Sequence, residues 1–164
     1  YHDIGKNAII SVVNNDYRPL TDEEFGIIKK HPALGAELLK IAPSLYEKFR
    51  DTTLGHHKWY NGKGGYPADF DNTKSPIRFL IDIVTLSDCL QAATERVGRN
   101  YRISKTFEVV MSELRAGAGT KYNPDLVALI DAYPKLAKKL HHLVENGWIE
   151  IYYHIYSRFF QKSL

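Results

Sequence analysis

Cysteine is nearly absent from this sequence of 164 residues, in which Cys89 carries the single thiol. One cysteine excludes an intramolecular disulfide and is typical of proteins in a reducing compartment, so we expect a cytoplasmic location. Long apolar runs are absent as well, since no stretch of the sequence approaches the roughly 20 apolar residues of a membrane-spanning helix. We therefore expect no membrane segment in this chain.

Neither sign of charge is in large excess. The sequence has 22 Lys and Arg residues against 19 Asp and Glu residues, which gives a net charge of +3 at pH 7. This small positive charge suits phosphate-bearing ligands but is too weak to indicate nucleic-acid binding, so we expect no DNA partner. With 44% hydrophobic and 25% charged residues, the composition indicates one globular domain with a core of its own.

Strand-like alternation, internal repeats and low-complexity segments are absent too. Helical signals are present instead: Thr21 and Glu24 have the spacing of a capping box, which predicts a helix that begins at Asp22. Three glycines and two prolines within 61–76 predict a loop there. We therefore predict an all-α fold, with helices over residues 4–14, 22–30, 32–40, 44–57, 77–96, 105–115, 124–133 and 134–161.

The sequence does contain a set of side chains that bind metal ions, each near the end or the buried face of a predicted helix. A histidine pair opens the glycine-rich stretch HHKWYNGKGGYP at 56–67. A histidine pair alone has an ordinary explanation in the core or on the surface, but further candidates accompany it: His2, Asp3, His31 and Asp88. Imidazole and carboxylate together favour a first-row transition metal over magnesium, which prefers oxygen ligands.

These motifs, taken in order, resemble the HD-GYP branch of the HD superfamily of metal-dependent phosphohydrolases. HDIGK at 2–6 resembles the HD motif with its trailing lysine, and HHKWYNGKGGYP resembles the family's HHExxDGxGYP. Three further segments resemble the family's other motifs. Residues 20–39 resemble the segment that contains the next histidine, and residues 81–102 resemble the helix with the late aspartate and its RPYR-like end. Residues 117–127 are similar to the family's GTxFDPxLV. The resemblance covers about residues 1 to 130.

The resemblance implies an HD-domain helical bundle over residues 1–164 and a site for one or two divalent ions, iron or manganese. One metal position would use Asp3, His31, His56 and His57, and the other would use His2, Asp3 and Asp88. The family takes a further ligand from a helix upstream of the HD motif. Because the chain begins at Tyr1, we expect that this upstream helix, and a sensor or signalling domain before it, lie outside it.

The resemblance also implies the reaction, in which metal-activated water attacks a phosphodiester. Asp3 and Lys6 would be the catalytic residues, and the residues that contact the substrate would be Lys6, Tyr66, Arg99 and Arg102. The implied substrate is cyclic di-GMP, another cyclic dinucleotide or another phosphorylated nucleotide. Lys6 lies one helical turn after His2, so the two side chains point to one side; a solvated lysine is the alternative.

Three positions depart from the family pattern. Lys58 stands in place of the glutamate of HHE, Asn61 in place of the aspartate of the DG turn, and Gln91 in place of a second aspartate in the late helix. One extra glycine also lengthens the loop before Tyr66. These departures leave two further hypotheses open: a degenerate domain that binds a nucleotide or a partner without turnover, and a phosphohydrolase that acts on a different nucleotide.

Overall fold

The computed structural model describes residues 1–13, 18–96 and 103–160. These residues form helices and no strand, and their β-type pairings are two isolated bridges, Lys58–Gly65 and Ala118–Tyr122. The all-α prediction is confirmed. In chain order the elements are η1 (Ile4–Ile9), α1 (Ile10–Val13), α2 (Asp22–Ile28), α3 (His31–Leu39), α4 (Pro43–Gly55), η2 (Asn72–Lys74), α5 (Arg78–Thr94), α6 (Phe107–Ala116), α7 (Pro124–Ala132) and α8 (Pro134–Phe160).

Local sequence signals explain where these helices begin. The predicted capping box is present: the Thr21 hydroxyl accepts from the Glu24 amide, and the Glu24 carboxylate accepts from the Thr21 amide. Proline occupies the first turn of α3, α4, α7 and α8, where its missing N–H has no helical partner to lose. Several predicted ends are shifted by about two residues. Helices α2, α4 and α5 end at Ile28, Gly55 and Thr94, and α6 begins at Phe107.

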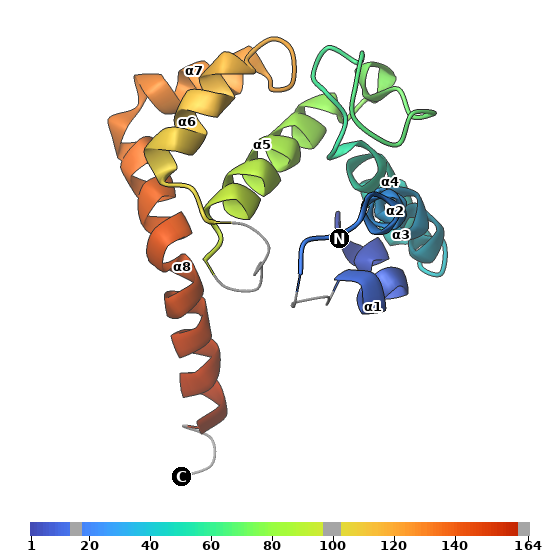
Figure 1. Cartoon of the computed structure of the whole chain (residues 1–164), viewed down its shortest axis with the longest axis horizontal. Coiled ribbons are helices and arrows are strands. Elements are labelled where there is room, and N and C mark those ends of the chain that lie inside the picture. The colour runs from blue at the N-terminus through green and yellow to red at the C-terminus, as the bar shows by residue number, and fades with distance from the viewer. Residues whose placement is uncertain (14–17, 97–102, 161–164) are drawn as a thin grey trace.

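Helix α5 lies between two groups of helices (Figure 1). On one side, η1 and α1–α4 form the N-terminal half, and on the other, α6, α7 and α8 form the C-terminal half. The buried hydrophobic core belongs to the C-terminal half and to α5; its members are Leu86, Leu90, Phe107, Val110, Met111, Leu114, Leu126, Val127 and Ile130. The predicted metal ligands lie toward the N-terminal half, so α5 connects the core to the site.

Helix α8 extends well past the rest of the molecule, and its last residues lie far from the start of the chain (Figure 1). Its first half packs on the core through partly buried side chains, Leu136, Ala137, Leu140 and Val144. None of the described helices, α8 included, combines the length and the apolar content that crossing a membrane requires.

Candidate metal centre

The structure brings together all six side chains that the sequence predicts as metal ligands. They fall into two groups, in each of which the ligand atoms lie within 4.8 Å of one another: Asp3, His31, His56 and His57, and His2, Asp3 and Asp88. Asp3 belongs to both groups, and a carboxylate has two oxygens with which it can bridge two ions. The proximity of the six is an observation, and their role as ligands stays a prediction.

A close approach of η1 to α3 determines where His2 and Asp3 lie. Gly5 has no room for a side chain, because a Cβ there would lie 1.9 Å from the carbonyl oxygen of His31 and 2.5 Å from the amide nitrogen of Gly35. Glycine alone allows the two backbones to come this near. Gly5 thus positions the two candidate ligands, which its sequence pattern does not reveal by itself; the available signal is a glycine inside a predicted helix, two residues after Asp3.

Hydrogen bonds to the backbone orient the two innermost imidazoles. His31 and His56 are both fully buried. His31 Nδ1 lies 2.7 Å from the carbonyl oxygen of Ile28, and His56 Nδ1 lies 2.8 Å from that of Thr53. Because a carbonyl oxygen only accepts, Nδ1 carries the proton in each neutral ring, and Nε2 presents a lone pair.

Three electron-pair donors therefore converge. The two Nε2 atoms of His31 and His56 lie 3.0 Å apart, and Asp3 Oδ1 lies 3.2 Å from the first and 3.6 Å from the second. Asp3 Oδ1 is buried and makes no hydrogen bond with any residue that the structure describes. Such an arrangement is repulsive unless a cation lies among the donors. The residues present thus fit a metal ion.

The other predicted ligands lie around this centre at longer distances. His2 Nε2 lies 3.5 Å from Asp3 Oδ2 and 3.8 Å from Asp88 Oδ1. His57 Nδ1 lies 3.9 Å from Asp88 Oδ2. Asp88, on α5, therefore faces both His2, which precedes η1, and His57, which follows α4.

The electrostatic surroundings keep these groups in the protonation states that metal binding requires. Burial lowers the pKa of His56 and, with the neighbouring imidazoles, lowers the pKa of His57 to about 3. Burial alone would raise the pKa of Asp3 and of Asp88, but the Lys6 ammonium acts against it at Asp3 and the neighbouring His2 acts against it at Asp88, and both pKa values are lowered. At neutral pH these imidazoles are thus neutral and these carboxylates ionised, as metal ligands must be.

Lys6 lies beside the cluster. Its ammonium donates to Asp3 Oδ2, and both side chains are about a third exposed or less. The lysine therefore balances the charge of the shared carboxylate on the side where the cluster opens to solvent. The predicted contacts of Lys6 with a phosphate, and its catalytic role with Asp3, stay predictions.

The loop after the histidine pair is folded back on His57. Gly65 has a φ of +80°, and a Cβ there would lie 2.0 Å from the His57 carbonyl oxygen, so only glycine fits. Tyr66 donates its amide to the same carbonyl, and its ring lies on the His57 ring with the centroids 4.5 Å apart. The peptide bond between Tyr66 and Pro67 is cis. Tyr66 is thus placed beside the cluster, while its predicted contact with a substrate stays a prediction.

The three departures from the family pattern have different surroundings. Lys58 is buried, and its ammonium donates to the Pro67 carbonyl oxygen at 3.1 Å. Asn61 Oδ1 accepts from the Lys63 amide and so closes the turn, and Gln91 is exposed on α5. Arg99 and Arg102, the predicted phosphate contacts, lie outside the described residues.

Comparisons with known proteins identify the family of this chain. Residues 1–126 match the sequence model of the HD domain family. The chain is similar to a cyclic di-GMP phosphodiesterase of Thermotoga maritima, with 32% identity over 140 residues that cover 85% of this chain and 36% of the relative. It is also similar to a cyclic di-GMP phosphodiesterase of Vibrio cholerae, with 29% identity over 145 residues, 84% of this chain and 28% of the relative.

A further relative from Vibrio cholerae is the 3'3'-cGAMP-specific phosphodiesterase 2, with 29% identity over 130 residues, 79% of this chain and 24% of the relative. The chain thus spans about a third or less of the length of these curated relatives. All six predicted metal ligands lie within the matched residues 1–126. The family match ends inside α7, so the extension of the domain to residue 164 stays a prediction.

Proposed function

The chain belongs to the HD domain family and has an HD-GYP-like domain, and we propose that it is a metal-dependent phosphodiesterase that hydrolyses a cyclic dinucleotide. The observation that carries this proposal is the convergence of Asp3 Oδ1 with the Nε2 atoms of His31 and His56, whose Nδ1 atoms are both taken up by backbone carbonyl oxygens. Relatives named as phosphodiesterases of cyclic di-GMP or 3'3'-cGAMP support the substrate class.

Iron or manganese fits this set of imidazole and carboxylate ligands better than a hard cation does. The shared carboxylate of Asp3 supports a site for two ions. When bound, a divalent ion supplies Lewis acidity and makes water nucleophilic near neutral pH. The backbone bonds of His31 and His56 hold the ligand atoms in position before any ion arrives, which lowers the cost of reorganisation.

The remaining predicted residues would act on the substrate. Lys6, with its ammonium at the open side of the cluster, would neutralise a phosphate oxygen. The ring of Tyr66, stacked on His57, would offer a surface to a base. Arg99 and Arg102 would contact the second phosphate as forked donors. Attachment to a sensory domain and a cytoplasmic location remain predictions.

The experiment measures bound metal and turnover on the same preparations. The wild-type chain, loaded with manganese or ferrous iron, should contain metal and hydrolyse cyclic di-GMP. His31→Ala and His56→Ala should lose both properties, while His141→Ala, outside the cluster on α8, should keep both. Unchanged metal content in the two cluster variants would refute the proposed site. Parallel assays with 3'3'-cGAMP and with a linear dinucleotide identify the substrate.

A second candidate function is binding of the nucleotide without turnover. Lys58 favours it, because a buried lysine next to His57 brings positive charge close to a site for cations. Metal-loaded protein that binds cyclic di-GMP in calorimetry but releases no product would support this second function and contradict the first.

A further inference from the structure

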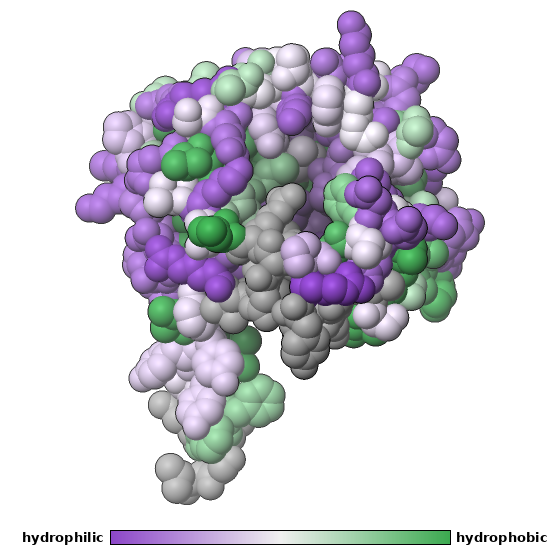
Figure 2. Space-filling view, in the orientation of Figure 1, coloured by the Kyte–Doolittle hydropathy of each residue, from purple (hydrophilic) through white to green (hydrophobic). Residues whose placement is uncertain are grey.

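The second half of α8 exposes an unusual amount of apolar surface. We call residues 148–160 the α8 stalk. Figure 2 shows it projecting below the body with a pale and green surface, while strongly hydrophilic residues gather on the body above. Its large hydrophobic side chains are all between 49% and 73% exposed: Trp148, Ile149, Ile151, Tyr152, Tyr153, Ile155, Tyr156, Phe159 and Phe160.

Eight of these nine residues form two adjacent rows along the helix, and the ninth, Ile151, lies at the border with the polar side. One row is Trp148, Tyr152, Ile155 and Phe159, and the other is Ile149, Tyr153, Tyr156 and Phe160. Each row has the spacing of four, three and four residues, which is the seam spacing of paired helices.

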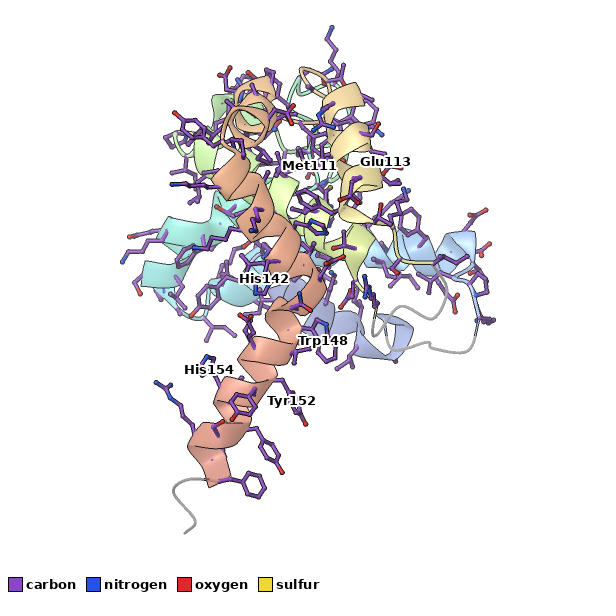
Figure 3. The ribbon with its side chains drawn as sticks, turned by 90° about the vertical axis from the view of Figure 1, so that its left-hand side faces the viewer. Met111, Glu113, His142, Trp148, Tyr152 and His154 are labelled. Atoms are coloured by element: carbon purple, nitrogen blue, oxygen red, sulfur yellow. The ribbon has the colours of Figure 1, made fainter. Side chains whose placement is uncertain are left out.

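The polar residues of the stalk, Glu150, His154, Ser157 and Arg158, repeat with helical spacing on the opposite side. Figure 3 shows this division, since Trp148 and Tyr152 leave the helix on one side and His154 on the other. The apolar side therefore carries no charge.

Neighbouring rings already stack along the stalk. The rings of Tyr152 and Tyr156 have centroids 6.3 Å apart, and those of Tyr156 and Phe160 have centroids 4.3 Å apart. These contacts restrict the side chains before any partner binds, which reduces the entropy lost on association. Tyrosine, tryptophan and phenylalanine are also enriched in protein–protein interfaces relative to the rest of the protein surface.

The exposed area matches what a stable dimer needs. The six aromatic side chains are 51% to 73% exposed, and at about 150–250 Å² for each ring they alone offer on the order of 700 Å². A standard interface takes roughly 800 Å² from each partner. A lipid surface fits less well, because helices that lie on membranes carry rows of Lys and Arg on the polar side, and Arg158 is the one basic residue of the stalk apart from His154.

We propose that the α8 stalk pairs with the α8 stalk of a second copy of this chain, in an antiparallel two-fold dimer. A partner helix that lies between the two rows contacts both, and an isologous interface needs only this one surface. The position of the body selects the direction. Antiparallel packing keeps the two bodies at opposite ends of the pair, since the stalk projects clear of its own body (Figure 1), whereas parallel packing would bring both bodies to the same end.

The test is the oligomeric state of the whole chain by analytical ultracentrifugation. Wild type should be a dimer at about 100 μM, and Trp148→Lys or Phe159→Glu alone should raise the dissociation constant by roughly 100-fold, because each buries an unpaired charge. In an antiparallel pair, position 148 faces position 159 of the partner. The double variant with both substitutions should therefore regain the dimer.

His154→Lys and Ser157→Glu, on the polar side, are the matched controls and should leave the dimer intact. Far-UV circular dichroism checks that α8 stays helical in every variant. A wild-type monomer at all concentrations would overturn the proposal and leave a different protein or a lipid surface as the occupant. A dimer that survives either single substitution, or a double variant that stays monomeric, would overturn it as well. None of these outcomes depends on metal or on phosphodiesterase activity.

Discussion

Substituting Gly5 by alanine should remove metal binding although Gly5 is not a ligand. The added Cβ would lie 1.9 Å from the His31 carbonyl oxygen, whereas ordinary contacts begin at 3.4 Å. Both neighbours on α3 are backbone atoms, which cannot rotate away as a side chain could. Helices η1 and α3 must therefore separate by roughly 1.5 Å, and a change of this kind costs about 1–3 kcal/mol of stability.

The separation matters because the ligands of one ion must lie close together. Asp3 Oδ1 and His31 Nε2 are 3.2 Å apart. Two ligands at bond lengths of about 2.1 Å can be at most ~4.2 Å apart when they share an ion. Adding roughly 1.5 Å along the line between them would bring this distance to ~4.7 Å, above that limit, so Asp3 and His31 could no longer bind the same metal.

The assay is manganese or iron content by elemental analysis after loading and desalting, with thermal unfolding measured on the same samples. Gly5→Ala should stay folded, with a lower melting temperature, and lose most of its metal. The matched control is Gly26→Ala on α2, where nothing lies within 4 Å of the added Cβ, and which should keep its metal. A Gly5→Ala chain with full metal content would refute the reasoning that η1 must contact α3.

Two further predictions concern the histidine pair and its loop. Lys58→Glu should lower the free energy of unfolding by about 3 kcal/mol, because the new carboxylate cannot donate to the Pro67 carbonyl oxygen. Denaturant unfolding measures this effect, and Lys63→Glu, at an exposed position of the same loop, is the control. The metal-free chain should lose stability as the pH falls from about 6.5, because the pKa of His57 is lowered to about 3 in the folded state and the unfolded state binds the proton first. Unfolding measured at pH 7 and pH 5 should show a loss of up to about 1.4 kcal/mol per pH unit below 6.5, and His57→Gln should reduce that slope.

The helices were predictable from the sequence because their signals are local. A capping box at Thr21, prolines in the first turns and glycines in the loop act within a few residues of where they stand, and the structure places helix ends within about two residues of most predicted ones. The length of α8 also followed from its pattern. That its second half leaves the body could not follow, since periodicity gives an apolar side but not what covers it.

The ligands of the candidate site could be predicted as residue types in a familiar order, but their geometry could not. The tautomers of His31 and His56 depend on carbonyl groups of Ile28 and Thr53, and any residue at those positions supplies a carbonyl. The close contact at Gly5 depends on Gly35, thirty residues later in the sequence. Such features belong to the packing of η1 on α3, and no local pattern encodes them.

Lys58 shows how the two kinds of information combine. From the sequence, a lysine next to two candidate ligands predicts repulsion of the metal ion, and Lys58→Glu should then raise metal affinity. In the structure the ammonium is buried but bound to the Pro67 carbonyl oxygen, so the lysine holds the end of the loop whose Tyr66 ring covers His57. The same residue thus carries a charge that opposes the ion and a hydrogen bond that shapes the site. An ionised glutamate has no proton to donate to the Pro67 carbonyl oxygen and would place a negative charge beside it. We therefore expect the loss of stability in Lys58→Glu to outweigh any gain in attraction for the metal.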